Sequence, residues 1–351
     1  MTSTGANSES RDLAFAAADV LLTIAIPTFN RNALLALCLA EINAQVSVLA
    51  VTGSVRIVVI DNASPTPVVD TLGPLPPWVE VRRNPVNVGG NGNILRCFET
   101  CMTPWLWVIG DDDRPEAGAV AAALASVNEH ADAVAILHAV RNQVIRERGW
   151  SAVGADDFMR RLDNFGNLLF VSSTLYRLAP LRPFFDLGYH YAYSCAPHLV
   201  LLFSALSRDG GRIAFLPTSN IAYERPEVEN RGWIIPIARG LPILLELPHL
   251  SRATRWCLGR HLSRFPTLGS LVHQSLLRQR FAHGGVLAET ANYLVGLTRL
   301  PWRYAPLRRV LGLALVPILL VPWLSYPVVA LAFRVLTGQT SGRHKLPVDR
   351  Y

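Results

Sequence analysis

The sequence predicts an α/β fold, a mostly parallel sheet with helices on both faces, followed by a helical C-terminal region. Over the first 140 residues, short runs of β-branched and apolar residues alternate with segments of helical periodicity, which is the pattern of a parallel sheet covered by helices. Beyond Arg225 the chain is punctuated by proline, rich in arginine and helical in its spacing. We therefore expect a disordered or extended segment at 1–19, an α/β domain at 20–225 and a helical region at 226–351.

Five strands are expected before residue 141, with helices between them. They are predicted at 21–26, 55–60, 79–82, 105–109 and 133–140. Apolar residues at helical spacing fill the intervals, for example Leu35, Cys38 and Ile42 after the first strand. The pattern is less regular in the second part of the domain, 141–225, where a strand is predicted at 168–175 and a helix at 197–206.

Composition narrows the classes of partner. Half of the residues are hydrophobic, 17% are charged and the net charge is +7, so phosphorylated substrates, anionic lipids and nucleic acids would all be attracted. Nucleic acid is disfavoured because no recognition motif accompanies the arginines. The five cysteines show no CxxC spacing, which disfavours a disulfide framework or a zinc site. Residues 1–10 lack a signal-peptide pattern, so the α/β domain is expected in the cytosol.

Polar residues follow three of the predicted strands. The first strand leads into Pro27, Thr28 and Asn30, the second into Asp61, and the fourth into the acidic residues 111–113. In an open α/β sheet the ligand lies beyond the carboxyl ends of the strands. We therefore expect these residues to meet at one ligand site.

The acidic residues Asp111, Asp112 and Asp113 are the strongest chemical signal. Three adjacent carboxylates repel one another unless a cation compensates them. Hard oxygen ligands suit Mg²⁺ or Mn²⁺, which proteins typically bind together with substrate phosphates. A solvated acidic turn that caps the following helix is the alternative.

The other strand ends are ambiguous when taken one at a time. Asp61 is suited to a nucleobase or ribose, or to an Asx turn. Asn30 is suited to a ligand, or to the N-cap of the following helix. The segment 84–93 is rich in glycine and asparagine, as in a loop that presents backbone amides to a ligand or in a tight turn.

Four motifs in order resemble those of family 2 glycosyltransferases. They read Thr-Ile-Ala-Ile-Pro-Thr-Phe-Asn-Arg, Val-Val-Ile-Asp-Asn-Ala-Ser, Asn-Val-Gly-Gly-Asn-Gly-Asn and Trp-Val-Ile-Gly-Asp-Asp-Asp. The resemblance covers about residues 20–220. It implies a GT-A fold, which is Rossmann-like, a nucleotide-diphosphate sugar donor, Mg²⁺ or Mn²⁺ as cofactor, and inversion at the anomeric carbon. It also implies a division of the domain into a nucleotide-sugar-binding part at 20–140 and an acceptor region at 141–225.

The resemblance assigns roles to positions in these motifs. Asp113 is the expected metal ligand of the DxD motif, Asp111 would face the ribose or the metal, and Asp112 would contact the donor sugar or the waters of the metal. The remaining donor-binding positions border the nucleotide, its base and its ribose, and are Pro27, Thr28, Asn30, Asp61, Asn87, Gly89 and Asn93.

The catalytic base is not evident. Family members commonly supply it from an acidic pair at the start of a helix beyond the acceptor strand, and this sequence lacks that pair. The candidates in the corresponding stretch are Asp186, His190 and His198. Each is also compatible with a structural role, as a turn residue, a member of an aromatic cluster or a polar group at a helix start.

An apolar segment predicts membrane contact. Residues 310–333 carry no charge and are long enough to cross a bilayer, but Pro317, Pro322 and Pro327 leave re-entrant and interfacial placements open. The preceding arginines, from Arg252 to Arg280, indicate a surface for anionic headgroups or a lipid-linked acceptor, or an ordinary solvated face. The expected location is the cytoplasmic face of a membrane.

The function predicted from the sequence is inverting transfer of a sugar to a glycan or lipid-linked acceptor in cell-surface polysaccharide biosynthesis. A sugar nucleotidyltransferase is one alternative, but residues 26–31 contain no glycine, whereas that class usually has a glycine-rich phosphate loop there. A catalytically silent scaffold of the same fold is another, because the acidic pair is missing.

Overall fold

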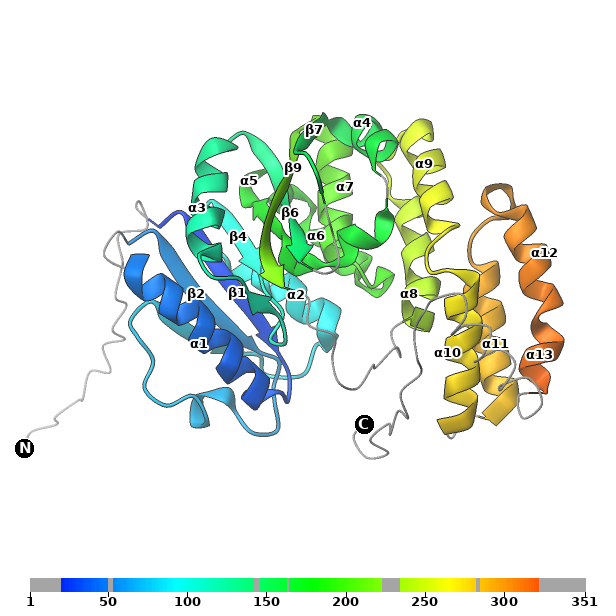
Figure 1. The fold of residues 1–351 in the computed structure, drawn as a ribbon, viewed down its shortest axis with the longest axis horizontal. Helices are drawn as coiled ribbons and strands as arrows, with labels where there is room; N and C mark the ends of the chain where they lie inside the picture. Colours follow the sequence, from blue (N-terminus) through cyan, green and yellow to red (C-terminus); the bar gives the residue numbers. More distant parts are fainter. Residues whose placement is uncertain are drawn as a thin grey trace, which may run out of the picture.

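A computed structural model describes residues 20–49, 53–141, 146–162, 164–222, 234–281 and 285–321. The expected N-terminal segment 1–19 lies outside these residues. Figure 1 shows a sheet with helices on both sides and, at one end of the molecule, a separate group of helices formed by the C-terminal part of the chain.

Four parallel strands form the first half of the sheet. They are β1 (Leu22–Thr28), β2 (Val55–Asp61), β3 (Val79–Arg83) and β4 (Trp105–Val108), in the order β3-β2-β1-β4. The strands predicted at these positions are confirmed, with small shifts at their ends. The three central strands are almost fully buried because helices cover both faces, and this is why they read as continuous apolar runs.

The second half of the sheet is mixed. Strand β8 (Thr174–Arg177) pairs antiparallel with both β4 and β6 (Ala133–Arg141), and β6 pairs in parallel with β9 (Arg212–Ala222). Two short strands, β5 (Arg114–Pro115) and β7 (Trp150–Val153), pair antiparallel with β9. The predicted strand at 133–140 is confirmed, and the sheet is parallel only in its N-terminal half and at β6–β9.

Helices on the two faces of the sheet enclose two apolar cores. On one face α1 (Asn32–Leu49) and α3 (Ala119–Glu129) pack through residues such as Leu35, Ile42 and Val120. On the other face lie α2 (Gly89–Thr100), α4 (Gly154–Arg161) and α7 (Pro197–Asp209). The predicted α/β class with helices on both faces is therefore confirmed.

Short helices connect these elements. They are η2 (Val68–Asp70), η3 (Phe165–Leu169), η4 (Val171–Ser173), α5 (Leu178–Leu181), η5 (Arg182–Phe184), α6 (Phe185–His190) and η6 (Ala192–Ser194). The strand predicted at 168–175 is wrong over most of its length, since only Thr174 onward is a strand. The Asn164 side chain accepts a hydrogen bond from Gly166 N and starts η3, and Ser173 Oγ donates to Phe170 O. Such local side-chain bonds compete with a strand ladder.

Among the described residues, α1 alone is long and apolar enough to cross a membrane. One of its faces, which includes Leu35, Cys38 and Ile42, is buried against the sheet. This helix is therefore a core helix of the α/β domain.

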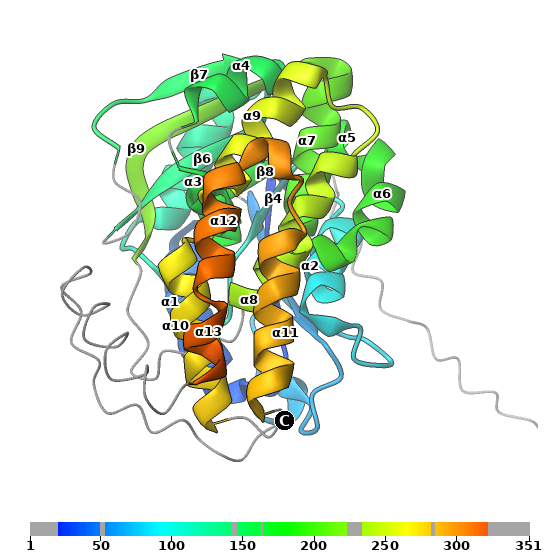
Figure 2. The same cartoon turned by 90° about the vertical axis from the view of Figure 1, so that its right-hand side faces the viewer.

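The C-terminal region is helical as predicted, over its described residues. It comprises α8 (Ile234–Gly240), η8 (Leu241–Glu246), α9 (Arg252–Leu262), α10 (Leu268–Phe281), α11 (Gly285–Thr298), η9 (Trp302–Tyr304), α12 (Pro306–Ala314) and α13 (Val316–Leu320). Helices α8 and α9 lie between the sheet and the group α10–α13 (Figure 1). Figure 2 shows α10, α11, α12 and α13 side by side, with their axes roughly aligned.

The uncharged run 310–333 is described only as far as residue 321. Up to there it forms the end of α12 and the short α13, with Pro317 in the first turn of α13. The described part is thus two short helices and not one continuous helix. Residues 322–333 lie outside the described residues, so membrane spanning stays a prediction.

A glycine contact joins the helical region to the α/β domain and generates a first prediction. A Cβ at Gly240 would lie 2.6 Å from Tyr193 O and 2.8 Å from Ser194 O, which are backbone atoms that cannot swing away. Gly240→Ala should lower the free energy of unfolding by about 1–3 kcal/mol. Gly269→Ala is the control, since nothing lies within 4 Å of a Cβ there, and it should change stability by less than about 1 kcal/mol. Equal denaturant midpoints for the two variants would contradict the contact.

Candidate functional site

The sheet order places three polar strand ends next to one another. Strand β1 lies between β2 and β4, and all three run in the same direction. Thr28 at the end of β1 is in register with Asp61 at the end of β2, and Asp111 follows β4 by a few residues. The predicted convergence of these residues at one edge of the sheet is therefore present in the structure.

Asp111 joins β1 to β4 through its carboxylate. The Thr28 hydroxyl donates to Asp111 Oδ2 at 2.7 Å, and Arg31 Nη1 donates to Asp111 Oδ1 at 2.8 Å. The same Arg31 nitrogen donates to Asp112 Oδ2 at 2.8 Å. Burial raises the pKa of Asp111, although Arg31 and Thr28 favour its charged form. One guanidinium nitrogen thus stands between two carboxylates, in a position suited to positive charge.

Asp113 turns back toward the end of β4. Its Oδ2 accepts hydrogen bonds from the Ser172 hydroxyl and, at 3.2 Å, from Gly110 N. A Cβ at Gly110 would lie 2.7 Å from the same oxygen, so any other residue at this position would displace the Asp113 carboxylate. Burial raises the pKa of Asp113 to about 6, even though Ser172 stabilises the carboxylate.

The chemistry of this turn fits a divalent cation that is shared with a substrate. Asp111, Asp112 and Asp113 offer hard oxygen donors, and Arg31 already places a positive charge between two of them. Within the described part of the chain, no group of three His, Cys, Asp or Glu side chains is arranged to hold a metal ion by itself. A cation here would therefore need further oxygen ligands, such as those of a diphosphate.

Asp61 is fully buried, and both of its carboxylate oxygens have a partner. Ser64 N donates to its Oδ1 at 2.9 Å, which is the Asx-type turn considered above, and Arg83 forms an ion pair with its Oδ2. Burial raises the pKa of Asp61, but the hydrogen bonds from Ser64 and Arg83 outweigh it and the net pKa is lowered. A nucleobase contact by Asp61 stays a prediction, and it would have to accommodate Arg83.

Asn30 does not cap α1. It lies two residues before the first residue of that helix, with φ of 53°, and its backbone N–H donates to Ser64 Oγ at 2.9 Å. Left-handed φ values are accessible to asparagine at modest cost. Asn30 therefore belongs to a turn after β1 that is bonded to the segment after β2, whereas Pro27 lies within β1, in register with Ile60 of β2. Both lie where the sequence places donor contacts.

Four asparagines fasten the loop 84–93 to the strand ends. Asn62 Oδ1 accepts from Asn84 Nδ2 and from Val88 N, both at 3.0 Å, while its Nδ2 donates to Asn87 Oδ1 at 2.7 Å. Asn93 Oδ1 accepts from Asn84 Nδ2 at 2.9 Å, and its Nδ2 donates to Ile60 O at 3.0 Å. The predicted donor residues Asn87 and Asn93 thus have a structural role in this asparagine network.

Gly89 begins helix α2 at the end of the loop. Its φ is +77°, which disfavours other residues, and its N–H donates to Asn87 Oδ1 at 2.8 Å. Because Gly89 and Asn87 are exposed, this end of the loop is accessible to a ligand that approaches the helix N-terminus.

The three candidate bases occupy different environments. Asp186 and His190 are exposed on α6, and the His190 ring packs edge-on against Tyr191. His198 is buried at the start of α7, where Nε2 donates to Leu168 O at 3.1 Å and Nδ1 has no hydrogen-bond partner. Burial lowers the pKa of His198 to about 4, so the imidazole is neutral at pH 7. No hydrogen bond joins these three side chains to the acidic turn within the described residues, and their catalytic role stays a prediction.

Sequence reasoning missed several partners of the predicted residues. Arg31 follows Asn30 directly, and a positively charged residue next to a predicted strand end could have indicated a partner for the acidic residues. Arg83 at the end of β3 gave a similar signal. Ser172 gave none, because it is 59 residues from Asp113 in the chain and lies in a segment predicted to be a strand.

Comparison with known proteins identifies the domain. Residues 23–183 match the sequence profile described as Glycosyl transferase family 2. This match lies within the predicted α/β domain and confirms the resemblance to family 2 glycosyltransferases over this part of the chain. No curated protein sequence matches the chain.

Solved structures with the same fold include S. aureus TarS 1–349. It superposes with a TM-score of 0.52 at 14% sequence identity, over 92% of this chain and 93% of TarS 1–349. The complex of TarS 1–349 with UDP-GlcNAc gives the same values, and the complex with UDP has 15% identity. At this identity the similarity shows the GT-A glycosyltransferase fold, which confirms the predicted fold and extends into the C-terminal helices.

The asparagine network of this glycosyltransferase domain generates a second prediction. Asn93→Ala should lower the free energy of unfolding by about 2–4 kcal/mol, because it removes the buried hydrogen bond that Asn93 accepts from Asn84 Nδ2 and the one that it donates to Ile60 O. Asn87→Ala should cost about 1 kcal/mol, since Asn87 is exposed and water can replace it. Urea unfolding of the two variants measures the difference. The network has no structural role at Asn93 if both variants unfold at the parental midpoint.

Proposed function

We propose that this protein is an inverting glycosyltransferase that moves a sugar from a nucleotide-diphosphate sugar to a glycan or lipid-linked acceptor in cell-surface polysaccharide biosynthesis. The observation that carries the proposal is the acidic turn Asp111–Asp113, bonded to Thr28 and Arg31 at the carboxyl ends of β1 and β4 within a family 2 domain. The complexes of TarS 1–349 with UDP-GlcNAc and UDP support a nucleotide-sugar donor.

In this proposal Asp113 and Asp111 hold Mg²⁺ or Mn²⁺, and Asp112 lies toward the donor sugar. The cation would supply charge neutralisation for the departing nucleotide diphosphate. Thr28 orients Asp111 through a 2.7 Å hydrogen bond, and Ser172 orients Asp113. Arg31 holds the turn together by its bonds to Asp111 and Asp112, and its guanidinium is also suited to a phosphate oxygen.

The donor nucleotide is placed by the neighbouring strand ends. Pro27, Asn30 and Asp61 would border the base, and the exposed end of the loop, at Asn87 and Gly89, would approach the ribose. Asn93 would act through the position of this loop, because it is itself buried. A preformed loop binds its ligand without a large ordering cost.

Inversion requires a base near the acceptor hydroxyl. Asp186 and His190 are the better candidates, because both are exposed at the acceptor region. His198 would have to give up its bond to Leu168 O and reach solvent before it accepted a proton. The proposed location, the cytoplasmic face of a membrane, is supported by the arginine-rich helical region.

Turnover of labelled nucleotide sugars, with membrane extract as the source of acceptor, tests the proposal. Transfer of label into a lipid or glycan fraction supports a glycosyltransferase. Formation of a nucleotide sugar from a sugar phosphate would establish a nucleotidyltransferase instead. If neither reaction is detected with any donor or extract, the protein is a catalytically silent scaffold.

A third prediction separates the carboxylates of the acidic turn. Asp113→Asn should reduce transfer by at least about a hundredfold, because it removes a metal-binding carboxylate while keeping the shape of the side chain. Its folding should be checked by circular dichroism. Asp112→Asn is the control, since Asp112 is exposed and bonded only to Arg31 among the described residues, and its loss should be about tenfold or less. Full metal-dependent activity in Asp113→Asn would remove Asp113 from the metal site.

A fourth prediction concerns Asp61. Asp61→Asn should weaken donor binding by about tenfold or more while changing turnover at saturating donor much less, as expected of a group that contacts the nucleotide and not the reacting carbon. The asparagine keeps the Ser64 turn, so the loop is retained. Calorimetric titration with the donor and a saturation curve measure the two quantities. An unchanged donor affinity would count against a nucleotide contact.

A further inference from the structure

The outer face of α12 is apolar, although it lies at the surface of the described structure. Leu307, Val310 and Leu311 follow the i, i+3, i+4 spacing of one helix stripe and are 70, 57 and 51% exposed. The opposite face carries Arg309, which is 3% exposed, and Gly312, which is also buried. A surface helix in water normally buries its apolar face and exposes its charged face. In α12 the apolar side chains are exposed and Arg309 is buried.

Packing against α11 fixes this orientation. A Cβ at Gly312 would lie 2.6 Å from both Leu297 Cδ atoms, and the Tyr293 hydroxyl donates to Gly312 O at 2.9 Å. Any larger residue at Gly312 would force the Leu297 side chain to move. Rotating α12 to bury its outer face would therefore break this contact. It would also bring Leu307 or Leu311 to a position where the space beside α11 is small.

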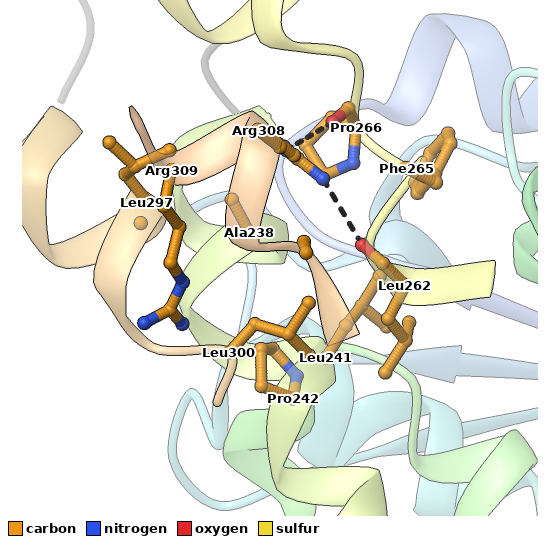
Figure 3. Close-up of a pocket in the computed structure, with 12 residues that line it drawn as sticks. Ala238, Leu241, Pro242, Leu262, Phe265, Pro266, Leu297, Leu300, Arg308 and Arg309 are labelled. Carbon is orange, nitrogen blue, oxygen red and sulfur yellow. Dashed lines mark hydrogen bonds between the residues drawn. The ribbon is translucent and has the colours of Figure 1, made fainter. Parts of the chain in front are cut away.

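Arg308 points inward and caps the C-terminal end of α9. It donates to the backbone carbonyls of Leu262, Ser263 and Pro266, and Figure 3 shows two of these bonds, to Leu262 and Pro266. Carbonyls at a helix C-terminus lack intrahelical partners and carry partial negative charge. Arg308 is thus a structural cap and a fixed part of the interface between α9 and α12.

Arg309 likewise caps the C-terminal end of α11. It donates to the carbonyl of Thr298, the last residue of that helix, at 3.0 Å and lies 5.2 Å from the centre of the Trp302 ring. The small pocket beside the two arginines (Figure 3) has a volume of about 20 Å³, which is room for about one water molecule. A lipid chain cannot enter it, so this pocket is not a lipid-binding site.

Charge identifies the partner of that face. From residue 251 to residue 321 the sequence contains ten arginines and one acidic residue, Glu289, which is buried in an ion pair with Arg278. Exposed Trp302 and Arg303 immediately precede α12. Tryptophan beside arginine at the end of an apolar surface is typical of the headgroup level of a membrane, and the excess of positive charge is complementary to anionic lipids.

We propose that the outer α12 face, formed by Leu307, Val310 and Leu311, docks on an anionic phospholipid surface, with Trp302 and Arg303 at the headgroups. A second copy of the chain is a less suitable occupant, because pairing two such faces would bring like charges together. The proposal rests on the membrane location proposed above and gives it a defined surface. It needs no transmembrane segment.

Vesicle binding by the full chain tests the proposal. Leu307→Gln with Leu311→Gln should weaken co-sedimentation with phosphatidylglycerol vesicles by about tenfold or more, because two apolar contacts are lost. The control is Val48→Gln with Met102→Gln, two apolar residues on the α/β domain that are at least as exposed as Leu307 and Leu311, and it should bind vesicles like the parent. Binding to phosphatidylcholine vesicles should be weaker, and added salt should lower binding to phosphatidylglycerol.

Each other outcome contradicts the proposal in a distinct way. If the α12 variant binds vesicles like its control, the outer α12 face does not contact lipid. If the parent is a dimer in sedimentation velocity without lipid and the α12 variant is a monomer with unchanged vesicle binding, a second copy occupies the face. Nucleotide-sugar binding, measured on the same variants, should be unaffected. If the parent protein itself does not bind a nucleotide sugar, the proposed transferase function is overturned instead.

Discussion

The carboxylates buried at adjacent strand ends are the constraint on which the site depends. Taking a carboxylate out of water costs several kcal/mol unless hydrogen bonds and a positive charge compensate it. Asp111 is compensated by Thr28 and Arg31, and Asp61 by Ser64 and Arg83. The bonds of Asp111 form because β1 lies beside β4, and the bond of Asp61 to Arg83 forms because β3 lies beside β2.

The same constraint explains the shape of the nucleotide side of the site. Once Asp61 and Asn62 are fixed at the end of β2, the asparagine network positions the loop that precedes α2. Asn84 bonds to Asn62 after β2 and to Asn93 in α2, and Asn93 bonds in turn to Ile60 O of β2, so the loop is set before any ligand binds. The acidic turn is positioned by Ser172 from the acceptor half of the domain. The two halves therefore meet at the acidic turn Asp111–Asp113.

Much of the fold could be predicted from the sequence, because the four parallel strands are continuous apolar runs that end in polar residues. The residues that complete the site could not. Ser172 reaches Asp113 only through the turn at η4, and Arg83 becomes a partner of Asp61 through strand pairing. Composition likewise predicts membrane contact from 310–333, but the inward orientation of Arg309 goes with its hydrogen bond to Thr298 O at the end of α11. Such features arise from packing between distant segments, which local patterns do not encode.

The most direct measurement is the thermal unfolding of the full chain with a panel of nucleotide-diphosphate sugars, in the presence of Mn²⁺ or of a chelator. A ligand that binds only the folded state stabilises it by about 2.7 kcal/mol at a hundredfold excess over Kd. At least one donor should raise the Tm by several degrees with Mn²⁺ and much less with the chelator, and Asp113→Asn should abolish the difference. If no nucleotide sugar shifts the Tm under either condition, the strand ends of β1, β2 and β4 are not a donor site.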